Sequence, residues 1–331
     1  MFDHLRIQVV QPCRARCTWC ATHLKNPLFA QLNTMGVADL IHDFYVEAIR
    51  YFRPREVFIS GGEPLLHPRF GALLTAIKDH TERIHIFTSY QWSVEEREAM
   101  PLAQMPLSKI VFNHTPIYFD PTRWDALTGE CFPFSVYLDN IRYFGQLEAR
   151  KRFKFIINHE DCVEELRRFH QMVEPDKRFQ LSLKVLNDQG DGLGREQMKR
   201  TATLIHQRAR ELDDIAQQAG WGKVGRKMGS IDQMSPLLES GDVSRCGYRQ
   251  RAIELRFALD RKARNGRPVL RYRYCPYFPP RSGHRFHIGR DELSRIEHNY
   301  RKGSYRKDCH ACRFLAYCTS EARTRETKDV G

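Results

Sequence analysis

Short apolar runs alternate with stretches of helical periodicity through the first two-thirds of the chain. Alternation of this kind is typical of a parallel sheet whose strands are joined by crossover helices. The apolar runs predict six strands, at residues 5–10, 56–60, 84–88, 110–113, 153–158 and 180–185. Apolar residues at helical spacing predict helices over residues 37–52 and 69–80, and Pro54 stops the first of them. We therefore expect six βα units.

The pattern changes after Asn187. A polar, glycine-rich loop over residues 187–194 leads into a predicted long polar helix over residues 195–218. From about residue 220 the chain is basic, loop-rich and rich in aromatic residues, proline and cysteine, which is typical of a small module that needs metal to hold it together. We therefore expect a barrel-like domain over residues 1–234 and a small module over residues 235–331.

Charge and hydropathy narrow the class of protein. The 331 residues include 53 Lys and Arg against 40 Asp and Glu, which gives a formal net charge of +13. A basic surface attracts anions, so we expect an anionic or polar substrate, although a solvated basic face would have the same composition. No apolar run reaches the roughly 18 residues of a membrane span, and the N-terminus does not resemble an export signal. These features predict a cytoplasmic protein.

Cysteine placement points to metal chemistry. The chain has ten cysteines, and in a reducing cytosol these favour metal binding over disulfides. A structural zinc site or a closed iron-sulfur cluster takes four protein ligands, whereas three cysteines leave one metal position open for another ligand. A zinc knuckle completed by His4 or His23 is the alternative. The motif is CxxxCxxC, directly after the first predicted strand, and consists of Cys13, Cys17 and Cys20, with Trp19 before the last cysteine.

A second motif follows the second predicted strand and reads Gly61-Gly62-Glu63-Pro64. Glycines let the backbone approach a ligand closely, and Glu63 supplies an acceptor for an ammonium group. Taken alone, this motif is an ordinary turn. Both motifs fall at the C-terminal ends of predicted strands, where the sites of barrel enzymes are built.

Together the two motifs resemble those of the radical S-adenosylmethionine (SAM) superfamily. The resemblance covers about residues 5–190 and implies an α/β fold, a partial (β/α)6 TIM-like barrel, in agreement with the six units. It also implies a [4Fe-4S] cluster on the three cysteines, SAM on the open iron, and a GGEP turn that holds the methionyl amino group. Polar residues near strand ends are further cofactor-binding candidates by position alone, and each could equally face solvent: Thr88, Ser89, Asn113, Asn158 and Lys184.

The C-terminal cysteines predict a second metal site. Their CxxCx5C spacing resembles part of the SPASM/twitch extension of radical SAM enzymes, which carries auxiliary clusters, and the reduced cysteine number implies one auxiliary [4Fe-4S] cluster. We favour Cys275 as the fourth ligand over Cys246, which would then be a thiol able to donate a hydrogen atom. Zinc, with His310 nearby, is the alternative. The three cysteines of the motif are Cys309, Cys312 and Cys318.

The resemblance implies reductive cleavage of SAM to a 5′-deoxyadenosyl radical, which removes a hydrogen atom from an unactivated carbon. Epimerisation, dehydrogenation or cross-linking of a natural-product intermediate or a peptide would follow. Because the first strand begins at Leu5, we expect no leader-peptide-binding domain before the barrel, which favours a small intermediate or a peptide presented by another protein. A reductase or flavodoxin-type donor would supply the electron. The alternative is a basic iron-sulfur or zinc protein that binds or modifies nucleic acid.

Overall fold

The fold is known from a computed structural model. It describes residues 2–13, 26–100, 102, 105–116, 118–128, 132–156, 161–174, 178–184, 211, 214–215, 217, 252–259, 268–274, 281–285 and 290–302. The strands are β1 His4–Gln8, β2 Glu56–Ser60, β3 Arg83–Phe87, β4 Ile110–His114, β5 Arg150–Ile156, β6 Phe179–Lys184, β7 Ala252–Leu259, β8 Pro268–Arg273 and β9 Arg281–Arg285. The α-helices are α1 Asn26–Thr34, α2 Ala38–Phe52, α3 Phe70–Ile77, α4 Val94–Glu98, α5 Pro121–Thr128, α6 Phe134–Gly145, α7 Cys162–Val173 and α12 Arg290–Arg301, with short 3-10 helices η2 Pro64–Leu66 and η4 Leu107–Lys109.

One nine-stranded sheet organises the described residues, in the order β6-β5-β4-β3-β2-β1-β7-β8-β9. Strands β1 to β6 are all parallel to their neighbours, as crossover helices require. The six predicted strands are therefore confirmed, with bounds that differ by at most three residues at the first residue of a strand and two at the last. This mixed α/β architecture with a mostly parallel sheet confirms the predicted fold class.

The C-terminal strands extend the same sheet. Strand β7 lies parallel to β1, with His4 opposite Ala252, and β8 and β9 continue outward as antiparallel neighbours. This extension was not predicted from the sequence. The predicted boundary near residue 235 and the predicted helix over 195–218 lie outside the described residues, apart from four positions of that helix, so the two-domain division stays a prediction.

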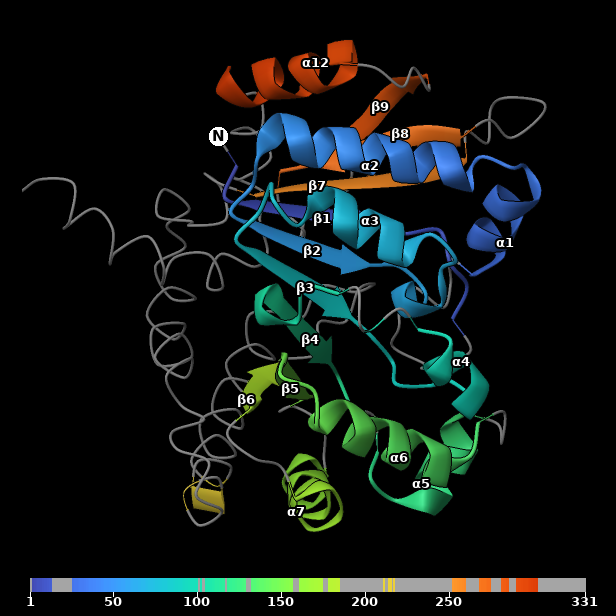
Figure 1. The fold of residues 1–331 in the computed structure, drawn as a ribbon, viewed down its shortest axis with the longest axis vertical. Helices are drawn as coiled ribbons and strands as arrows, with labels where there is room; N and C mark the ends of the chain where they lie inside the picture. The colour runs from blue at the N-terminus through green and yellow to red at the C-terminus, as the bar shows by residue number, and fades with distance from the viewer. Residues whose placement is uncertain are drawn as a thin grey trace, which may run out of the picture.

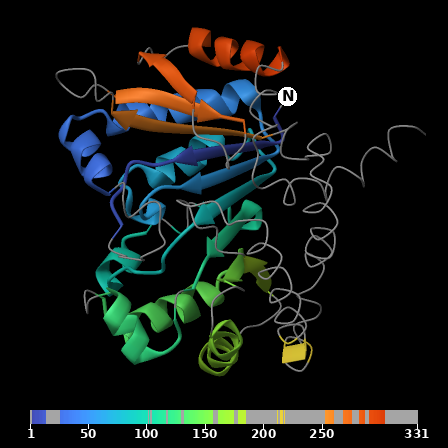
Figure 2. The same ribbon diagram turned by 180° about the vertical axis from the view of Figure 1, so that it is seen from behind.

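Helices cover one face of the sheet. Figure 1 shows α2 in front of β7 and α3 in front of β1 and β2, and Figure 2 shows the strands in front of these helices from behind. Helix α2 buries Ile41, Phe44, Ala48 and Ile49 at helical spacing against the strands. It ends at Phe52, where Arg53 adopts a left-handed conformation before Pro54. The predicted stop at Pro54 is thereby confirmed.

The strands have two distinct faces because successive side chains point to opposite sides. In β1, Leu5 and Ile7 are fully buried against the helices, whereas Arg6 between them is half-buried on the other side. In β5, Phe153 packs on Phe169 of α7, with ring centroids 4.9 Å apart. The helix-covered face therefore holds the apolar core, and polar and charged side chains occupy the opposite face.

Candidate functional site

The GGEP turn packs directly on the start of the cysteine loop. A methyl group added at Gly62 would lie 2.7 Å from the backbone nitrogen of Cys13 and 2.5 Å from the carbonyl carbon of Pro12. One added at Gly61, whose φ is +154°, would meet the backbone of Val9. Real Cβ contacts are essentially never shorter than 3.0 Å. The two glycines thus allow the turn to approach the backbone of residues 9–13, and this contact brings the two sequence motifs together.

Glu63 forms the centre of a hydrogen-bond network at the ends of β2 and β3. Its carboxylate accepts bonds from the Thr88 hydroxyl, at 2.9 and 3.0 Å, and from both the backbone N–H and the hydroxyl of Ser89, at 2.6 Å each. The N–H of Leu65 also donates to it, at 3.3 Å. Three of the predicted cofactor-binding residues are therefore in direct contact.

Burial makes this carboxylate electrostatically unusual. Glu63 is 1% exposed, and burial raises its pKa because the charged form loses hydration, while the bonds from Ser89, Thr88 and Leu65 oppose the rise. A carboxylate has roughly four acceptor positions, and these donors occupy them. In this geometry Glu63 fixes the positions of Thr88 and Ser89, so it orients the corner between β2 and β3.

Asn113 and His114 complete the same corner from β4. The backbone carbonyl of Asn113 accepts the N–H of Thr88 at 3.0 Å, and its side-chain nitrogen donates to the carbonyl of Val111 at 2.9 Å. Its side-chain oxygen is buried and has no hydrogen-bond partner among the described residues. The His114 ring lies 2.9 Å from the carbonyl of Thr88 and 2.7 Å from the Tyr137 hydroxyl, and burial lowers the pKa of His114 to about 4.

A pair of histidines lies beneath the GGEP turn on the helix side. The rings of His42 and His67 stack with centroids 3.8 Å apart, and His42 is 2% exposed. Burial, together with the neighbouring His67 and Arg69, lowers the pKa of His42 to about 3, so the ring is neutral at physiological pH. Neither ring nitrogen of His42 has a hydrogen-bond partner in the described part of the chain.

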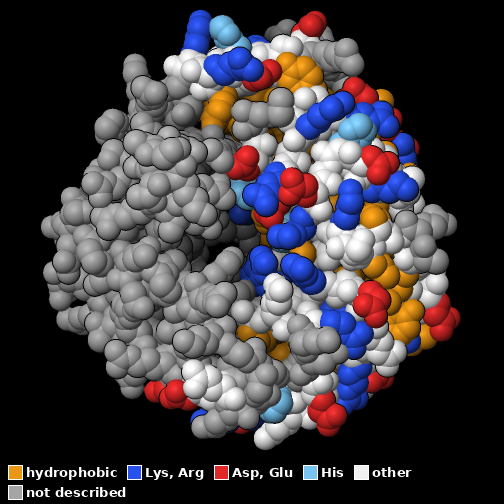
Figure 3. Space-filling view, turned by 60° about the vertical axis from the view of Figure 1, so that its left-hand side comes forward, with side chains coloured by type: hydrophobic (Ala, Val, Ile, Leu, Met, Phe, Trp, Pro, Cys, Tyr) orange, Lys and Arg blue, Asp and Glu red, His pale blue; other side chains and the backbone are white. Residues whose placement is uncertain are grey.

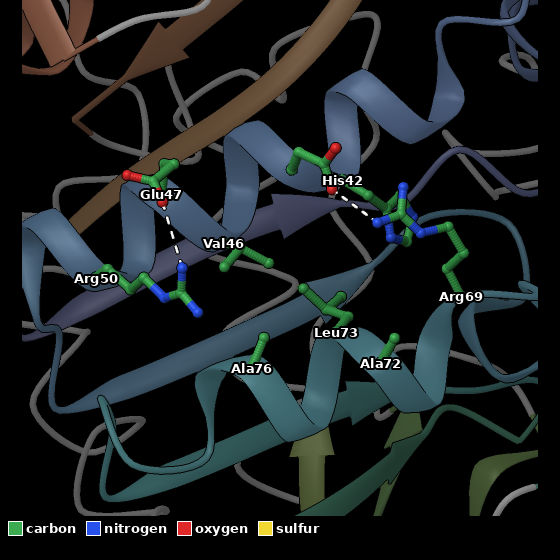
Figure 4. Close-up of a pocket in the computed structure, with 9 residues that line it drawn as sticks. His42, Val46, Glu47, Arg50, Arg69, Ala72, Leu73 and Ala76 are labelled. Atoms are coloured by element: carbon green, nitrogen blue, oxygen red, sulfur yellow. Dashed lines mark hydrogen bonds and ion pairs between the residues drawn. The ribbon is translucent and has the colours of Figure 1, made fainter.

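His42 also lines a cavity of about 370 Å³ between α2 and α3. Figure 4 shows Val46, Leu73 and Ala76 projecting into the space between the helices. Ion pairs lie at its two ends, Arg50 with Glu47 at 3.4 Å and Arg69 with Asp43 at 2.7 Å. The cavity opens on the helix-covered side of the sheet, so it is separate from the corner that Glu63 organises.

Several predicted site residues fall outside the description. Lys184 ends β6, but its side chain is not described. The alternative zinc knuckle stays a prediction: His4 begins β1 and lies 3.3 Å from Glu56, whereas Cys13 follows the other end of this strand. Cys13 itself is half-buried. The predicted residues outside the described ranges are Cys17, Trp19, Cys20, His23, Asn158, Cys246, Cys275, Cys309, His310, Cys312 and Cys318.

The sequence reasoning missed Arg152 and Lys154 on the polar face of β5, where Arg152 lies opposite Asn113 of β4. The predicted strand began at Phe153, three residues too late, because Lys151 interrupts the alternation of apolar and polar residues. Lys151 is fully buried on the helix side, where it donates to the carbonyl of Gly145 at 2.9 Å. Every second residue of this strand is basic, at Arg150, Arg152 and Lys154, and this spacing predicts a strand with one cationic face.

Comparisons with known proteins support the class that the motifs suggest. A crystal structure of SuiB from Streptococcus suis bound to S-adenosylmethionine superposes with a TM-score of 0.55 at 14% identity, over 96% of this chain and 70% of that chain. A GTP 3′,8-cyclase from Campylobacter lari is 26% identical over 110 residues, 33% of this chain and 34% of that relative. The match therefore spans about a third of the relative. No protein-family profile matches the chain.

The fold shared with SuiB is the mixed α/β, mostly parallel sheet described above. The CxxxCxxC and GGEP motifs and the match to the cyclase support the resemblance of the chain to the radical SAM superfamily.

The described residues of this corner fit the cofactors of that superfamily. Cys13 is half-buried and lies against Gly62, and the buried side-chain oxygen of Asn113 leaves an acceptor for a ligand group. Thiolates are the ligands that iron-sulfur clusters use. Among the described residues no cluster of three His, Cys, Asp or Glu side chains could hold a metal, since only the first cysteine of the motif is among them. No helix in the described part of the chain could span a membrane.

Proposed function

We propose that the chain is a radical SAM enzyme. A [4Fe-4S] cluster with bound SAM would supply the 5′-deoxyadenosyl radical that removes a hydrogen atom from an unactivated carbon of the substrate. The observation that carries the proposal is the backbone contact between Gly62 and Cys13, which brings the CxxxCxxC and GGEP motifs to the same end of the parallel sheet. Sites of barrel enzymes lie at this end of the strands.

Each residue of the corner has a role in this proposal. Cys13, Cys17 and Cys20 hold the cluster and leave one iron for SAM. Gly61, Gly62 and Pro64 shape the turn, and Trp19, within the cysteine motif, would contact the cofactor. Glu63 attracts the methionyl ammonium group through its charge while it positions Thr88 and Ser89, whose hydroxyl groups already bond to it. The cofactor-contacting residues on the later strands are Asn113, Asn158 and Lys184.

The C-terminal cysteines would hold one auxiliary [4Fe-4S] cluster, with Cys275 as fourth ligand beside the CxxCx5C motif. This cluster accepts the second electron of an oxidation or anchors the substrate. If Cys275 is the ligand, Cys246 has a thiol that can return a hydrogen atom to the substrate radical, as an epimerase requires. The motif is formed by Cys309, Cys312 and Cys318.

The substrate class is a peptide or a small natural-product intermediate with anionic or polar groups. This proposal rests on the net charge of +13 and on the superfamily. The electron would come from a flavodoxin-type protein or a reductase in the cytoplasm. The reaction would be an epimerisation, a dehydrogenation or a cross-link, and the Cys246 thiol distinguishes the first of these from the other two.

The test is anaerobic reconstitution with iron and sulfide, followed by iron counting and Mössbauer spectroscopy. The wild type should hold about eight irons and a Cys13/Cys17/Cys20→Ala triple variant about four, one cluster fewer. After reduction, only the wild type should form 5′-deoxyadenosine from SAM. Zinc in place of iron, or no SAM cleavage by the wild type, would overturn the proposal.

Cys246→Ala separates the possible fates of the substrate radical. With the natural substrate in deuterated water, an epimerase variant should still consume SAM and abstract hydrogen but lose the epimerised product. A matched Cys131→Ala variant should behave as wild type, since this cysteine lies outside both motifs. Unchanged turnover in Cys246→Ala would contradict the donor role and favour an oxidation that uses the auxiliary cluster.

A further inference from the structure

The polar face of the sheet carries several positively charged side chains. We call this the inner face and define it by Arg6, Phe58, His85, Phe87, Arg152 and Lys154, which alternate with residues buried under the helices. Figure 3 shows Lys and Arg side chains gathered near the middle of one side of the molecule, next to the atoms drawn in grey.

Arg152 is the most informative of these residues. It is half-buried, and its guanidinium has one polar partner among the described residues, the side-chain oxygen of Gln180 at 3.5 Å. No ion pair joins it to a carboxylate in the described part of the chain. Burial lowers the pKa of Arg152, the charge of Glu56 raises it, and Arg83 and Arg150 lower it, but an arginine remains protonated. Burying a cation without an anionic partner costs free energy, which a bound anion would restore.

Arg6 presents a second cation to the same surface. Its guanidinium carbon lies 5.0 Å from the centroid of the Phe58 ring, and its buried Nε has no hydrogen-bond partner within the described residues. The Phe58 ring stacks on His85 with centroids 4.3 Å apart. Burial lowers the pKa of His85, the hydrogen bond and charge of Glu56 oppose this change, and the charges of Arg152 and Lys154 add to it. The three cations therefore surround one aromatic stack.

Lys154 joins the group from the next outward position of β5. Its ammonium lies 4.4 Å from the centroid of the Phe87 ring, a cation–π contact that holds the side chain over the inner face. The strand register places Phe87, Asn113, Arg152 and Gln180 side by side across β3 to β6. Arg152 is therefore in register with Phe87, the residue just before Thr88 in the hydrogen-bond network of Glu63.

The carboxylates of this face are already engaged. Glu56 lies 3.3 Å from His4, 3.2 Å from Arg83 and 3.6 Å from His85, at the end of the strands far from the cysteine loop. Its pKa is held well below its usual range, mainly by the bonds from His4 and His85. Glu254 of β7 is opposite Arg6 in the sheet and is buried.

We propose that Arg152 and Arg6, with Lys154 beside them, bind an anionic group of the substrate, a phosphate or a carboxylate, on the inner face of the sheet. Guanidinium groups bind both kinds of oxyanion through paired hydrogen bonds. The proposal rests on the proposed function for the statement that this anion belongs to the substrate, and it names Arg152 as a specificity-determining residue.

The test measures anion binding by the full chain without SAM or reductant. Isothermal titration with inorganic pyrophosphate and with citrate should show saturable binding of at least one probe, weaker at higher salt. Arg152→Gln and Arg6→Gln should each weaken it about tenfold or more, and Arg152→Lys should weaken it less. The matched control is Arg167→Gln on the exposed side of α7, which should bind as wild type.

The outcomes separate the possible anions and the possible failures. Binding of pyrophosphate alone assigns a phosphate-bearing substrate, and binding of citrate alone a carboxylate-bearing one. If neither probe binds, or if Arg152→Gln binds as tightly as Arg167→Gln, the proposal is overturned. The melting temperature of Arg152→Gln should be no lower than that of the wild type, because an unpaired buried charge is removed; a lower value would mean that Arg152 has a structural partner.

The same preparations, reconstituted and reduced, report SAM cleavage independently. Anion binding without 5′-deoxyadenosine formation would refute the proposed function and leave the anion site standing. Cleavage of SAM by a protein that binds neither probe would refute only the anion site.

Discussion

Gly62→Ala tests how closely the GGEP turn must approach the cysteine loop. The added methyl carbon would lie 1.8 Å from the carbonyl oxygen of Gln11, 2.5 Å from the carbonyl carbon of Pro12 and 2.7 Å from the nitrogen of Cys13, all of them backbone atoms. To reach 3.0 Å from the carbonyl oxygen of Gln11, which would be only 1.8 Å from the methyl carbon, the turn and the loop must move apart by about 1.2 Å. Overpacking of this kind costs about 1–3 kcal/mol. The displacement also falls on the first cluster ligand.

Gly36→Ala is the matched control. Gly36 has a φ of +67°, with nothing within 4 Å of an added methyl group, so alanine there pays only the left-handed backbone cost of about 1–2 kcal/mol. Urea unfolding should show a loss of stability for both variants, but after anaerobic reconstitution only Gly62→Ala should have lost iron and SAM binding. A wild-type iron count and SAM affinity in Gly62→Ala would refute the reasoning.

Two further predictions follow from buried groups. Glu63→Gln replaces a hydrogen-bond acceptor by a donor opposite Ser89 and Thr88, so the SAM affinity measured by equilibrium dialysis should fall about tenfold or more. The exposed control Glu82→Gln should bind SAM as the wild type does. Equal SAM affinities of the two variants would exclude a role for the Glu63 charge. His67 and His114 have pKa values lowered by burial to about 4, against 6.5 in the unfolded chain. The contribution of each neutral histidine to the free energy of unfolding is complete above pH 6.5 and is lost as the pH falls towards 4. At pH 5 each histidine should have lost about 2 kcal/mol of it. A urea midpoint that is unchanged between pH 7.5 and pH 5 would contradict this prediction.

The strands could be predicted from the sequence because their signal is local. Residues 56–60 are a short, mainly apolar run between Pro54 and the two glycines, and the predicted bounds agree with β2. The position of β7 could not be predicted in this way. Its neighbour in the sheet is β1, and nothing in the eight residues Ala252–Leu259 indicates a partner almost 250 positions away. Pairing over such a separation is decided by packing of the whole sheet rather than by local preference.

The sequence predicted those parts of the candidate site that lie in the two motifs or at the ends of predicted strands. Glu63, Thr88 and Ser89 were placed at strand ends by pattern, and the structure joins them by hydrogen bonds. The sequence did not show that Gly62 packs on the backbone of Cys13, because this contact depends on how the loops after β1 and β2 are positioned relative to each other. Arg152 was missed because its importance comes from the absence of a described anionic partner, which is a property of three-dimensional surroundings.

The position of β1 between β2 and β7 determines when the cysteine loop obtains its support during synthesis. One edge of β1 is paired by residues 56–60, but the other edge waits for residues 252–255. At about 5–20 residues per second, roughly 10–40 seconds pass between the emergence of these two partners from the ribosome. During that interval β1 is an open edge strand, a structure prone to pair with other chains. A chaperone or slow expression at low temperature should therefore raise the yield of protein able to take up iron.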